Sequence, residues 1–182
     1  MAGERVILTY KDYEALPADG RRYELHEGEL SVTPAPSPLH QEISGNLHLL
    51  LGQHVRSRQL GKLLLSPIDC ILSDITVVQP DLLYLDPTRL HLVSARGIEG
   101  PPTLVAEILS PSTAGADRST KRQLYARHGV PYYWIVDPEA RVVEVYGLSE
   151  GVYQLSARVA GSEPVSLLPF PDLAFAPASL WP

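Results

Sequence analysis

The chain has 182 residues, of which 45% are hydrophobic and 20% charged. This composition excludes disordered and collagen-like proteins, and the length suits one domain over residues 1–182. No stretch approaches the ~20 apolar residues of a membrane span, and the charged N-terminus lacks the apolar block of a signal peptide. We therefore expect a cytoplasmic protein with no membrane partner. Cys70 is the only cysteine, which excludes an internal disulfide and a cysteine-based zinc cluster.

The formal net charge of −6 argues mildly against the simplest kind of nucleic-acid binder, which carries a basic surplus. Residues 117–128 (DRSTKRQLYARH) depart from this background with four cations and one acid. If the chain binds phosphate, Arg118 and Arg122 in this segment are the best local candidates.

The first third of the chain predicts a short helix, a hairpin and a long helix. Thr9 opens a helix over 9–16, and the alternation of apolar and polar residues over 21–33 predicts an N-terminal β-hairpin. A long helix is expected over about 38–59, because Ser37 is a good N-cap and apolar residues then recur at helical spacing.

The middle of the chain is rich in short apolar strands. Residues 62–72, 76–85 and 103–110 are apolar runs bounded by turn residues. The segment 86–102 contains three prolines and two glycines, so we expect a long loop there. A second helix is expected over about 117–128.

The last third predicts three strands in a meander, at 131–137, 141–148 and 152–159. An extended C-terminal arm is expected over 160–182. Its predicted anchors are Phe170, Phe175 and Trp181. This order of elements is typical of a single sheet flanked by helices, in the α/β or α+β class.

Two carboxylates interrupt strands that are otherwise apolar. Asp81 follows Pro80 in VVQPDLLYL, and Glu107 lies in the middle of TLVAEIL. Buried carboxylates are costly unless they are paired, hydrogen-bonded or bound to a metal, and a shared cation relieves their repulsion. Oxygen ligands favour Mg²⁺ or Mn²⁺. The structural alternative is that Asp81 caps a turn and Glu107 pairs with an arginine.

Lys121 lies in the helix that follows the strand of Glu107. Asp117 and Lys121 share one face of this helix, and Tyr125 lies beside it. A cation next to two metal-binding carboxylates would steady an attacking hydroxide or the charge that builds on a phosphate. Alternatively, Asp117 is an N-cap that forms an ordinary surface ion pair with Lys121.

Two further candidates lie in the first third of the chain. His40, in the first turn of the long helix, is placed to orient a substrate or a metal-bound water, or it is simply solvated. Glu24, on the hairpin, joins the site or faces solvent. The sequence contains no Gly-rich phosphate loop, no HExxH motif and no CxxC motif.

Five segments, in this order, resemble the Uma-type restriction endonucleases, a bacterial family within the PD-(D/E)XK nuclease superfamily. The resemblance covers nearly the whole chain, and its last segment is the most distinctive. The segments are YELHEGEL (23–30), PAPSPLHQEISGNL (34–47), Pro80-Asp81, VAEILSPST (105–113) and DRSTKRQLYARHGVPYYWIVDP (117–138).

The resemblance implies a restriction-endonuclease-like fold, with a central mixed sheet and helices on both sides. It also implies Mg²⁺-dependent (or Mn²⁺-dependent) cleavage of DNA phosphodiesters, with Asp81 and Glu107 holding the metal. The superfamily pattern has a lysine two residues after the acid, where this chain has Leu109. The Uma-type family generally shows this loss, and Lys121 matches the helix lysine proposed as its substitute.

Three functions are compatible with these residues. The first is a metal-dependent endonuclease that acts on DNA, and a homodimer would suit it because double-strand cutting needs two active sites. The second is a nuclease-fold protein without nuclease activity that serves as a binding or assembly module, which the acidic charge and Leu109 motivate. The third is a hydrolase of RNA or of another phosphoester.

Overall fold

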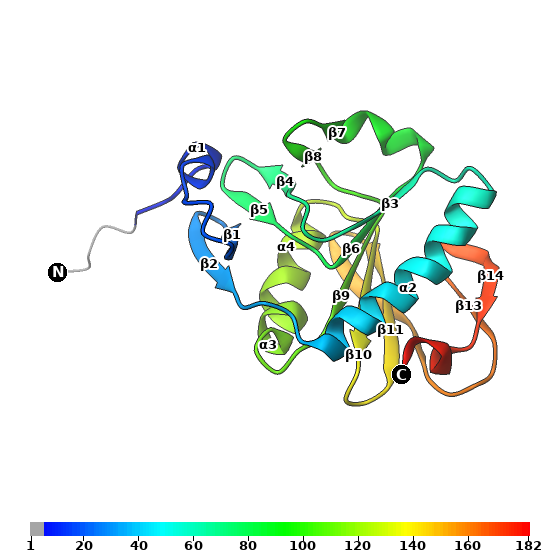
Figure 1. Ribbon diagram of the computed structural model, residues 1–182. Helices are drawn as coiled ribbons and strands as arrows, with labels where there is room; N and C mark the ends of the chain where they lie inside the picture. The colour runs from blue at the N-terminus through cyan, green and yellow to red at the C-terminus, as the bar shows by residue number, and fades with distance from the viewer. Residues whose placement is uncertain (1–5) are drawn as a thin grey trace.

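The structure is a computed structural model that describes residues 6–182, and it has the expected mixed α+β class (Figure 1). The single sheet expected from the sequence is wrong, because two six-stranded sheets are present and share a core. Helices cover both faces of the central sheet, as expected. The N-terminal hairpin belongs to the second sheet, and a strand pair near the C-terminus forms a third, small sheet.

The central sheet has the strand order β12-β11-β10-β9-β6-β3. It is mixed, because β9 and β10 run parallel and the other neighbours antiparallel. Its strands are β3 (Lys62–Leu65), β6 (Leu82–Leu85), β9 (Leu104–Ile108), β10 (Tyr132–Asp137), β11 (Val142–Ser149) and β12 (Val152–Val159). The predicted strand over 103–110 and the predicted meander are confirmed.

The second sheet has the strand order β2-β1-β5-β4-β8-β7. Its strands are β1 (Arg22–His26), β2 (Glu29–Thr33), β4 (Cys70–Ser73), β5 (Thr76–Val78), β7 (Val93–Ser94) and β8 (Gly97–Glu99). The predicted hairpin is confirmed as β1 and β2. The short helix opened by Thr9 is confirmed as α1 (Tyr10–Glu14), and its Tyr10 shares a small core with Leu25 and Val77 of this sheet.

Two predicted strands are each divided between the two sheets. The run 62–72 splits into β3 and β4 around Pro67, and the run 76–85 splits into β5 and β6 around Pro80. Proline cannot donate to a strand ladder, so strand pairing breaks where it occurs. The chain therefore crosses from the central sheet to the second sheet and back. Asp81 lies at the return crossing.

The prediction of a long loop over 86–102 is wrong. The segment forms a 3₁₀ helix, η1 (Pro87–Leu92), and the strands β7 and β8. The Asp86 side chain caps η1 by accepting a hydrogen bond from Thr88 N at 2.8 Å. A Cβ at Gly97, which has φ 132°, would lie 2.3 Å from the carbonyl oxygen of Asp69, so this close approach of β8 requires glycine.

The central sheet has an apolar core on each face, because alternate strand residues point to opposite sides. On one face, α2 (Pro38–Ser57) packs Leu47 against Ala106 and Trp134. On the other face, Leu124 packs in a cluster with Val105 and with residues of the second sheet. Glu107, two residues after Val105, therefore points toward that second face.

The structure tests the predicted starts of the two longer helices. The N-cap of α2 is confirmed, since the Ser37 hydroxyl accepts a hydrogen bond from His40 N at 3.2 Å. The helix predicted over 117–128 begins earlier, as α3 (Ala114–Ala116), continues as a π-helix, η2 (Asp117–Lys121), and ends as α4 (Arg122–Arg127). Single π turns within α-helices occur frequently at functional sites.

The extended C-terminal arm predicted over 160–182 is instead a folded hairpin. It consists of β13 (Val165–Leu167) and β14 (Phe170–Phe175), and a 3₁₀ helix, η3 (Pro177–Leu180), follows. The anchors were correctly predicted at Phe170 and Phe175, which are buried in the α2-side core, and Trp181 packs against it. Alternating apolar residues favour pairing of the two segments over an extended arm.

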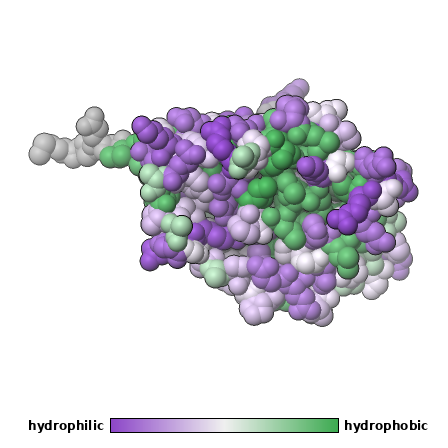
Figure 2. Space-filling model, turned by 45° about the horizontal axis from the view of Figure 1, so that its top comes forward, coloured by the Kyte–Doolittle hydropathy of each residue, from purple (hydrophilic) through white to green (hydrophobic). Residues whose placement is uncertain are grey.

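Figure 2 shows apolar surface gathered in the middle of the face on which α2, β3 and η1 lie. A groove of about 970 Å³ runs between these elements and is lined by residues that include Leu49, Leu63 and Leu90. None of the helices within residues 6–182 has the length and apolar character needed to cross a bilayer.

We expect Leu47→Ala to lower the free energy of unfolding by about 2–5 kcal/mol, because Leu47 is fully buried and its loss leaves a cavity between α2 and the central sheet. The matched control is Leu39→Ala on the same helix, where the side chain is 46% exposed and lies outside the lining of the groove, and the expected change is within about 0.5 kcal/mol. Urea unfolding of both variants measures this. Equal effects would contradict the packing of α2.

Candidate active site

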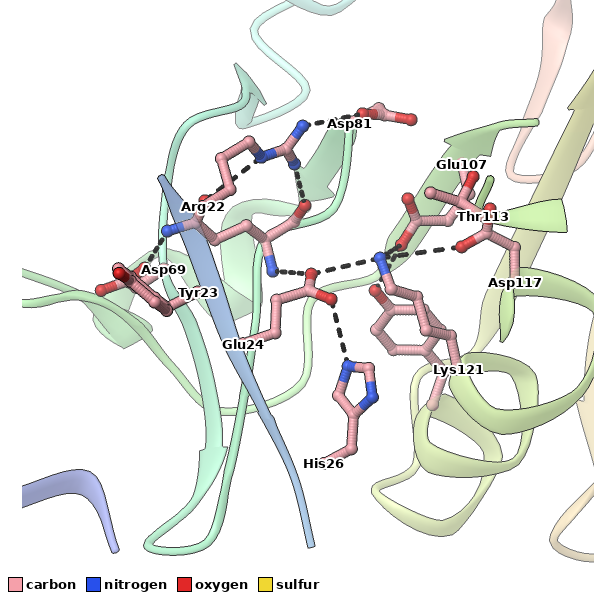
Figure 3. A network of polar contacts seen from close by, with 12 residues as sticks. Arg22, Tyr23, Glu24, His26, Asp69, Asp81, Glu107, Thr113, Asp117 and Lys121 are labelled. Carbon is pink, nitrogen blue, oxygen red and sulfur yellow. Dashed lines mark hydrogen bonds and ion pairs between the residues drawn. The ribbon is translucent and has the colours of Figure 1, made fainter. Parts of the chain in front are cut away.

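Four carboxylates and one lysine meet between the second sheet, the central sheet and the helix that begins at α3 (Figure 3). Glu24 comes from β1, Asp81 directly precedes β6, Glu107 comes from β9, and Asp117 and Lys121 come from η2. All five side chains are buried. The structure therefore brings together every residue to which the sequence assigned a catalytic or metal-binding role.

The Lys121 ammonium lies at the centre of this cluster. Its Nζ is 3.1 Å from Glu24 Oε1, 3.2 Å from Glu107 Oε1 and 3.7 Å from Asp117 Oδ1. Burial alone would lower the pKa of Lys121, but the surrounding carboxylates, Glu107 first, raise the pKa above its usual range. The ammonium is therefore charged at neutral pH, and the alternative of an ordinary surface pair with Asp117 is wrong.

Glu107 shares its Oε1 between two donors. Lys121 Nζ lies 3.2 Å away, and the Tyr125 hydroxyl donates a hydrogen bond at 2.7 Å. Burial raises the pKa of Glu107 well above its ordinary value of 4.5, the Lys121 ammonium opposes this, and the charges of Asp117 and Asp81 add to it. Glu107 does not pair with an arginine, as the structural alternative proposed. Tyr125 acts by holding this carboxylate.

Asp81 is held by three groups where the chain returns to the central sheet. Its Oδ2 accepts hydrogen bonds from Ile108 N at 2.9 Å and from His40 Nε2 at 3.0 Å. Its Oδ1 lies 3.8 Å from the Arg22 guanidinium. His40 is buried, so it is not the solvated residue that the sequence alternative described.

Glu24 is the carboxylate that links the second sheet to Lys121. Besides Lys121, it accepts hydrogen bonds from Gln79 N at 2.7 Å and from His26 Nε2 at 3.1 Å. Burial would raise the pKa of Glu24, but the Lys121 charge and the hydrogen bonds lower it to about 2. The alternative in which Glu24 faces solvent is therefore wrong.

A cavity of about 220 Å³ opens onto the cluster. Its floor includes Asp81, Glu107, Asp117, Lys121 and His40. Two loops, 34–37 and 110–113, together with Arg22 and Thr33, form the remainder of its lining. A ligand that enters this cavity therefore meets three of the carboxylates, Asp81, Glu107 and Asp117, beside the lysine.

The donors in the cavity suit a hard divalent cation. Asp81 and Glu107 offer carboxylate oxygens, and Asp117 Oδ1 is buried without a hydrogen-bond partner within residues 6–182. In the same part of the chain, no group of three or more His, Cys, Asp or Glu side chains is arranged to hold a metal. A Mg²⁺ ion held by one or two carboxylates, with water and substrate phosphate as its other ligands, fits this donor set.

The structure does not bring the predicted phosphate-binding arginines to the cavity. Arg118 donates hydrogen bonds to Glu144 at 2.7 Å and to Asp137 at 2.9 Å. Arg122 lies over the ring of Tyr146, 4.8 Å from its centroid. Arg118 is thus engaged by carboxylates, and the phosphate-binding role of both residues stays a prediction.

Two residues at the site were not predicted, Arg22 and His26. Both lie on β1 with Glu24, at alternate positions of one strand, so they share its face. Period-two alternation was therefore the signal that could have found them once Glu24 was suspected. His26 holds Glu24, and Arg22 reaches both Asp81 and the carbonyl oxygen of Gln79.

Comparison with known protein families matches residues 10–178 to the Uma2 model, which is described as "Putative restriction endonuclease". The chain belongs to the Uma2 family. A solved structure with the same fold is a putative nuclease belonging to DUF820 from Anabaena variabilis ATCC 29413, with a TM-score of 0.78 and 19% identity over 95% of this chain and 97% of that one. No curated protein matches the chain.

The Uma2 chain supplies its site lysine from the helix and not from the strand. Leu109, two residues after Glu107, is buried in the apolar cluster that also contains Leu124. Lys121 reaches Glu107 from η2 instead. The ammonium therefore lies beside Glu107, although position 109, two residues after Glu107, is not a lysine.

We expect Glu107→Gln to change how stability depends on pH. Because burial raises the pKa of Glu107, the folded chain retains a proton that the unfolded chain loses above about pH 4.5. Wild-type stability should therefore fall as pH rises above 4.5, and the variant should lack this pH-dependent contribution. Thermal unfolding across pH 4.5–8 measures it. If the wild type and Glu107→Gln had the same dependence of stability on pH, the raised pKa of Glu107 would be contradicted. The control is Glu139→Gln, which changes an exposed carboxylate.

Proposed function

We propose that this Uma2 protein is a divalent-metal-dependent endonuclease that hydrolyses DNA phosphodiester bonds. The observation that carries the proposal is the convergence of Asp81, Glu107 and Lys121 at the floor of one cavity. Membership of the Uma2 family supports the nuclease class. Hydrolysis adds water across a P–O bond, so one new end carries the phosphate and the other the hydroxyl group.

In this proposal, Asp81 and Glu107 hold the ion. The ion, Mg²⁺ or Mn²⁺, would activate water and neutralise phosphate charge. The Lys121 ammonium stabilises the additional negative charge on the phosphate during attack. Tyr125 and Ile108 N orient the two carboxylates through hydrogen bonds of 2.7 and 2.9 Å.

Two supporting residues act on these groups from outside the reacting centre. His40 donates to Asp81, which fixes that carboxylate against β9, and Glu24 holds Lys121 from the second sheet. Both act as positioning residues. Asp117 has no such role in the proposal, and its Oδ1, 3.7 Å from Lys121 Nζ, has no hydrogen-bond partner within residues 6–182.

The second candidate is a nuclease-fold binding module without activity. The net charge of −6 and the lack of a preformed group of three metal ligands within residues 6–182 favour it. The two candidates differ in one measurable property, since only the nuclease requires Asp81 and Glu107 to bind a cation.

We expect Asp81→Asn and Lys121→Met each to lower Mg²⁺-dependent cleavage of DNA by roughly 10²-fold or more, because each removes a charge that acts on the reacting phosphate. The control is Asp172→Asn, which changes an exposed carboxylate remote from the cavity. Release of fragments from labelled DNA measures the rate.

Calorimetry with Mn²⁺ gives a second readout that does not depend on activity. Asp81→Asn should lose binding that the wild type and Asp172→Asn share. Cleavage that survives in Asp81→Asn would remove the proposal. If the wild type binds neither Mn²⁺ alone nor Mn²⁺ together with DNA, the binding module replaces the nuclease as the assigned function.

A homodimer is part of the proposal. The apolar groove between α2, β3 and η1, with the 70% exposed Leu49 on its wall, provides surface that a second copy could cover. Light scattering should give twice the mass of one chain, and Leu49→Glu should return the mass to that of one chain. A single-chain mass for the wild type would contradict the dimer.

A further inference from the structure

The reacting groups lie at the floor of a small cavity. Asp81, Glu107 and Lys121 are only 5%, 2% and 5% exposed. The cavity volume of about 220 Å³ is smaller than the ~300–1,000 Å³ of ordinary small-molecule sites. A phosphodiester therefore reaches these groups only if it leaves most of its polynucleotide outside and inserts about one nucleotide.

The walls of this cavity are tied to regular elements. The loop 34–37 leads into α2 and ends at the N-cap Ser37, which is hydrogen-bonded to His40 N. The loop 110–113 leads into α3 and is closed by a hydrogen bond from Ala114 N to the carbonyl oxygen of Ser110 at 2.9 Å. The proline content of both loops restricts their backbone further. Both loops that line the cavity are therefore tied to the helices that follow them.

The charges in the cavity do not suit a duplex backbone. Binding along a duplex neutralises many phosphates with lysine and arginine. The lining offers two permanent cations, Arg22 and Lys121, against the carboxylates of Asp81, Glu107 and Asp117. Arg22 is also engaged with Asp81 and with the carbonyl oxygen of Gln79. The cavity can therefore neutralise only one or two phosphates.

Two buried atoms of the cavity lining lack a hydrogen-bond partner within residues 6–182, His40 Nδ1 and Asp117 Oδ1. His40 Nε2 lies 3.0 Å from Asp81 Oδ2, so Nδ1 is the ring nitrogen that remains for a ligand, and His40 is 8% exposed. A carboxylate oxygen accepts hydrogen bonds, so a ligand that donates an amino or hydroxyl hydrogen would satisfy Asp117 Oδ1. In paired DNA one hydrogen of each base amino group is used in pairing and the other lies in a groove, whereas an unpaired base can bring both to a recessed acceptor.

We infer that this site takes an unpaired DNA strand, either a single strand or a frayed strand end, and does not act on intact duplex. The inference rests on the proposed nuclease function and names its substrate class. Enzymes that act on a base in a recessed pocket bind it outside the base stack, and a phosphodiester that must enter this cavity meets the same limit of access. An unpaired strand requires one active site, so this substrate class does not depend on the homodimer.

Fluorescence anisotropy of three labelled probes tests the inference, with Ca²⁺ in place of Mg²⁺ as the oxygen-bound cation. The probes are a short DNA strand, the same strand paired with its complement, and an RNA strand of the same sequence. We expect the DNA strand to bind at least about 10-fold more tightly than the duplex. The slope of log K against log salt should be about −0.7 to −1.4, which corresponds to one or two phosphates.

Three results would overturn the inference. They are duplex binding as tight as that of the strand, a slope of about −4 or steeper, and the absence of strand binding. Tighter binding of the RNA strand would overturn the assignment to DNA.

A pair of variants tests whether the cavity is the binding site. Ser112 is exposed on the rim, so Ser112→Trp should fill the mouth and weaken strand binding by roughly 10-fold or more. Ser149, exposed at the end of β11, is the matched control, and Ser149→Trp should leave the affinity unchanged. Equal affinities of the two variants would overturn the inference.

Cleavage of the same DNA probes with Mg²⁺ separates the two proposals. Preferential strand binding with no cutting above the level of Asp81→Asn would remove the nuclease function and leave the strand preference. Cutting of the duplex as fast as the strand, lost in Asp81→Asn, would confirm the nuclease and overturn the strand preference.

Discussion

The buried ammonium of Lys121 is the interaction on which the arrangement of this protein depends. A buried charge is tolerated only when partners surround it, and Lys121 has three carboxylate partners from three elements. Glu24 contributes from the second sheet, Glu107 from the central sheet and Asp117 from the π-helix itself. One cation thus joins the N-terminal hairpin to the sheet that forms the main core, and the same cation faces the cavity.

The surroundings of Lys121 also give chemically similar carboxylates different properties. Glu24 accepts hydrogen bonds from His26 and a backbone amide, and its pKa lies at about 2. Burial raises the pKa of Glu107, and neighbouring carboxylates add to that rise. Glu24 therefore carries a stabilised charge, whereas burial opposes the charge on Glu107.

The position of the lysine shows that a site is defined by where atoms meet and not by sequence spacing. A lysine at position 109 would lie on the same strand face as Glu107, but that position is filled by Leu109, which packs in the core with Leu124. Lys121 reaches Glu107 from the π turn of the helix instead. The strand position is not available to a lysine in this chain, because it belongs to the apolar core.

The sequence by itself determined the local elements of this protein and the carboxylates that the structure buries at the candidate site. Helix α2, the hairpin and the meander follow from capping, turn residues and periodicity, which act over a few residues. Asp81 and Glu107 were identified because charge is costly inside apolar strands. Only the tertiary structure decided that Pro80 divides a strand between two sheets, that Glu24 meets Lys121, and that His40 meets Asp81. These contacts join residues more than 40 positions apart, and no local pattern specifies which distant strand or helix supplies the partner.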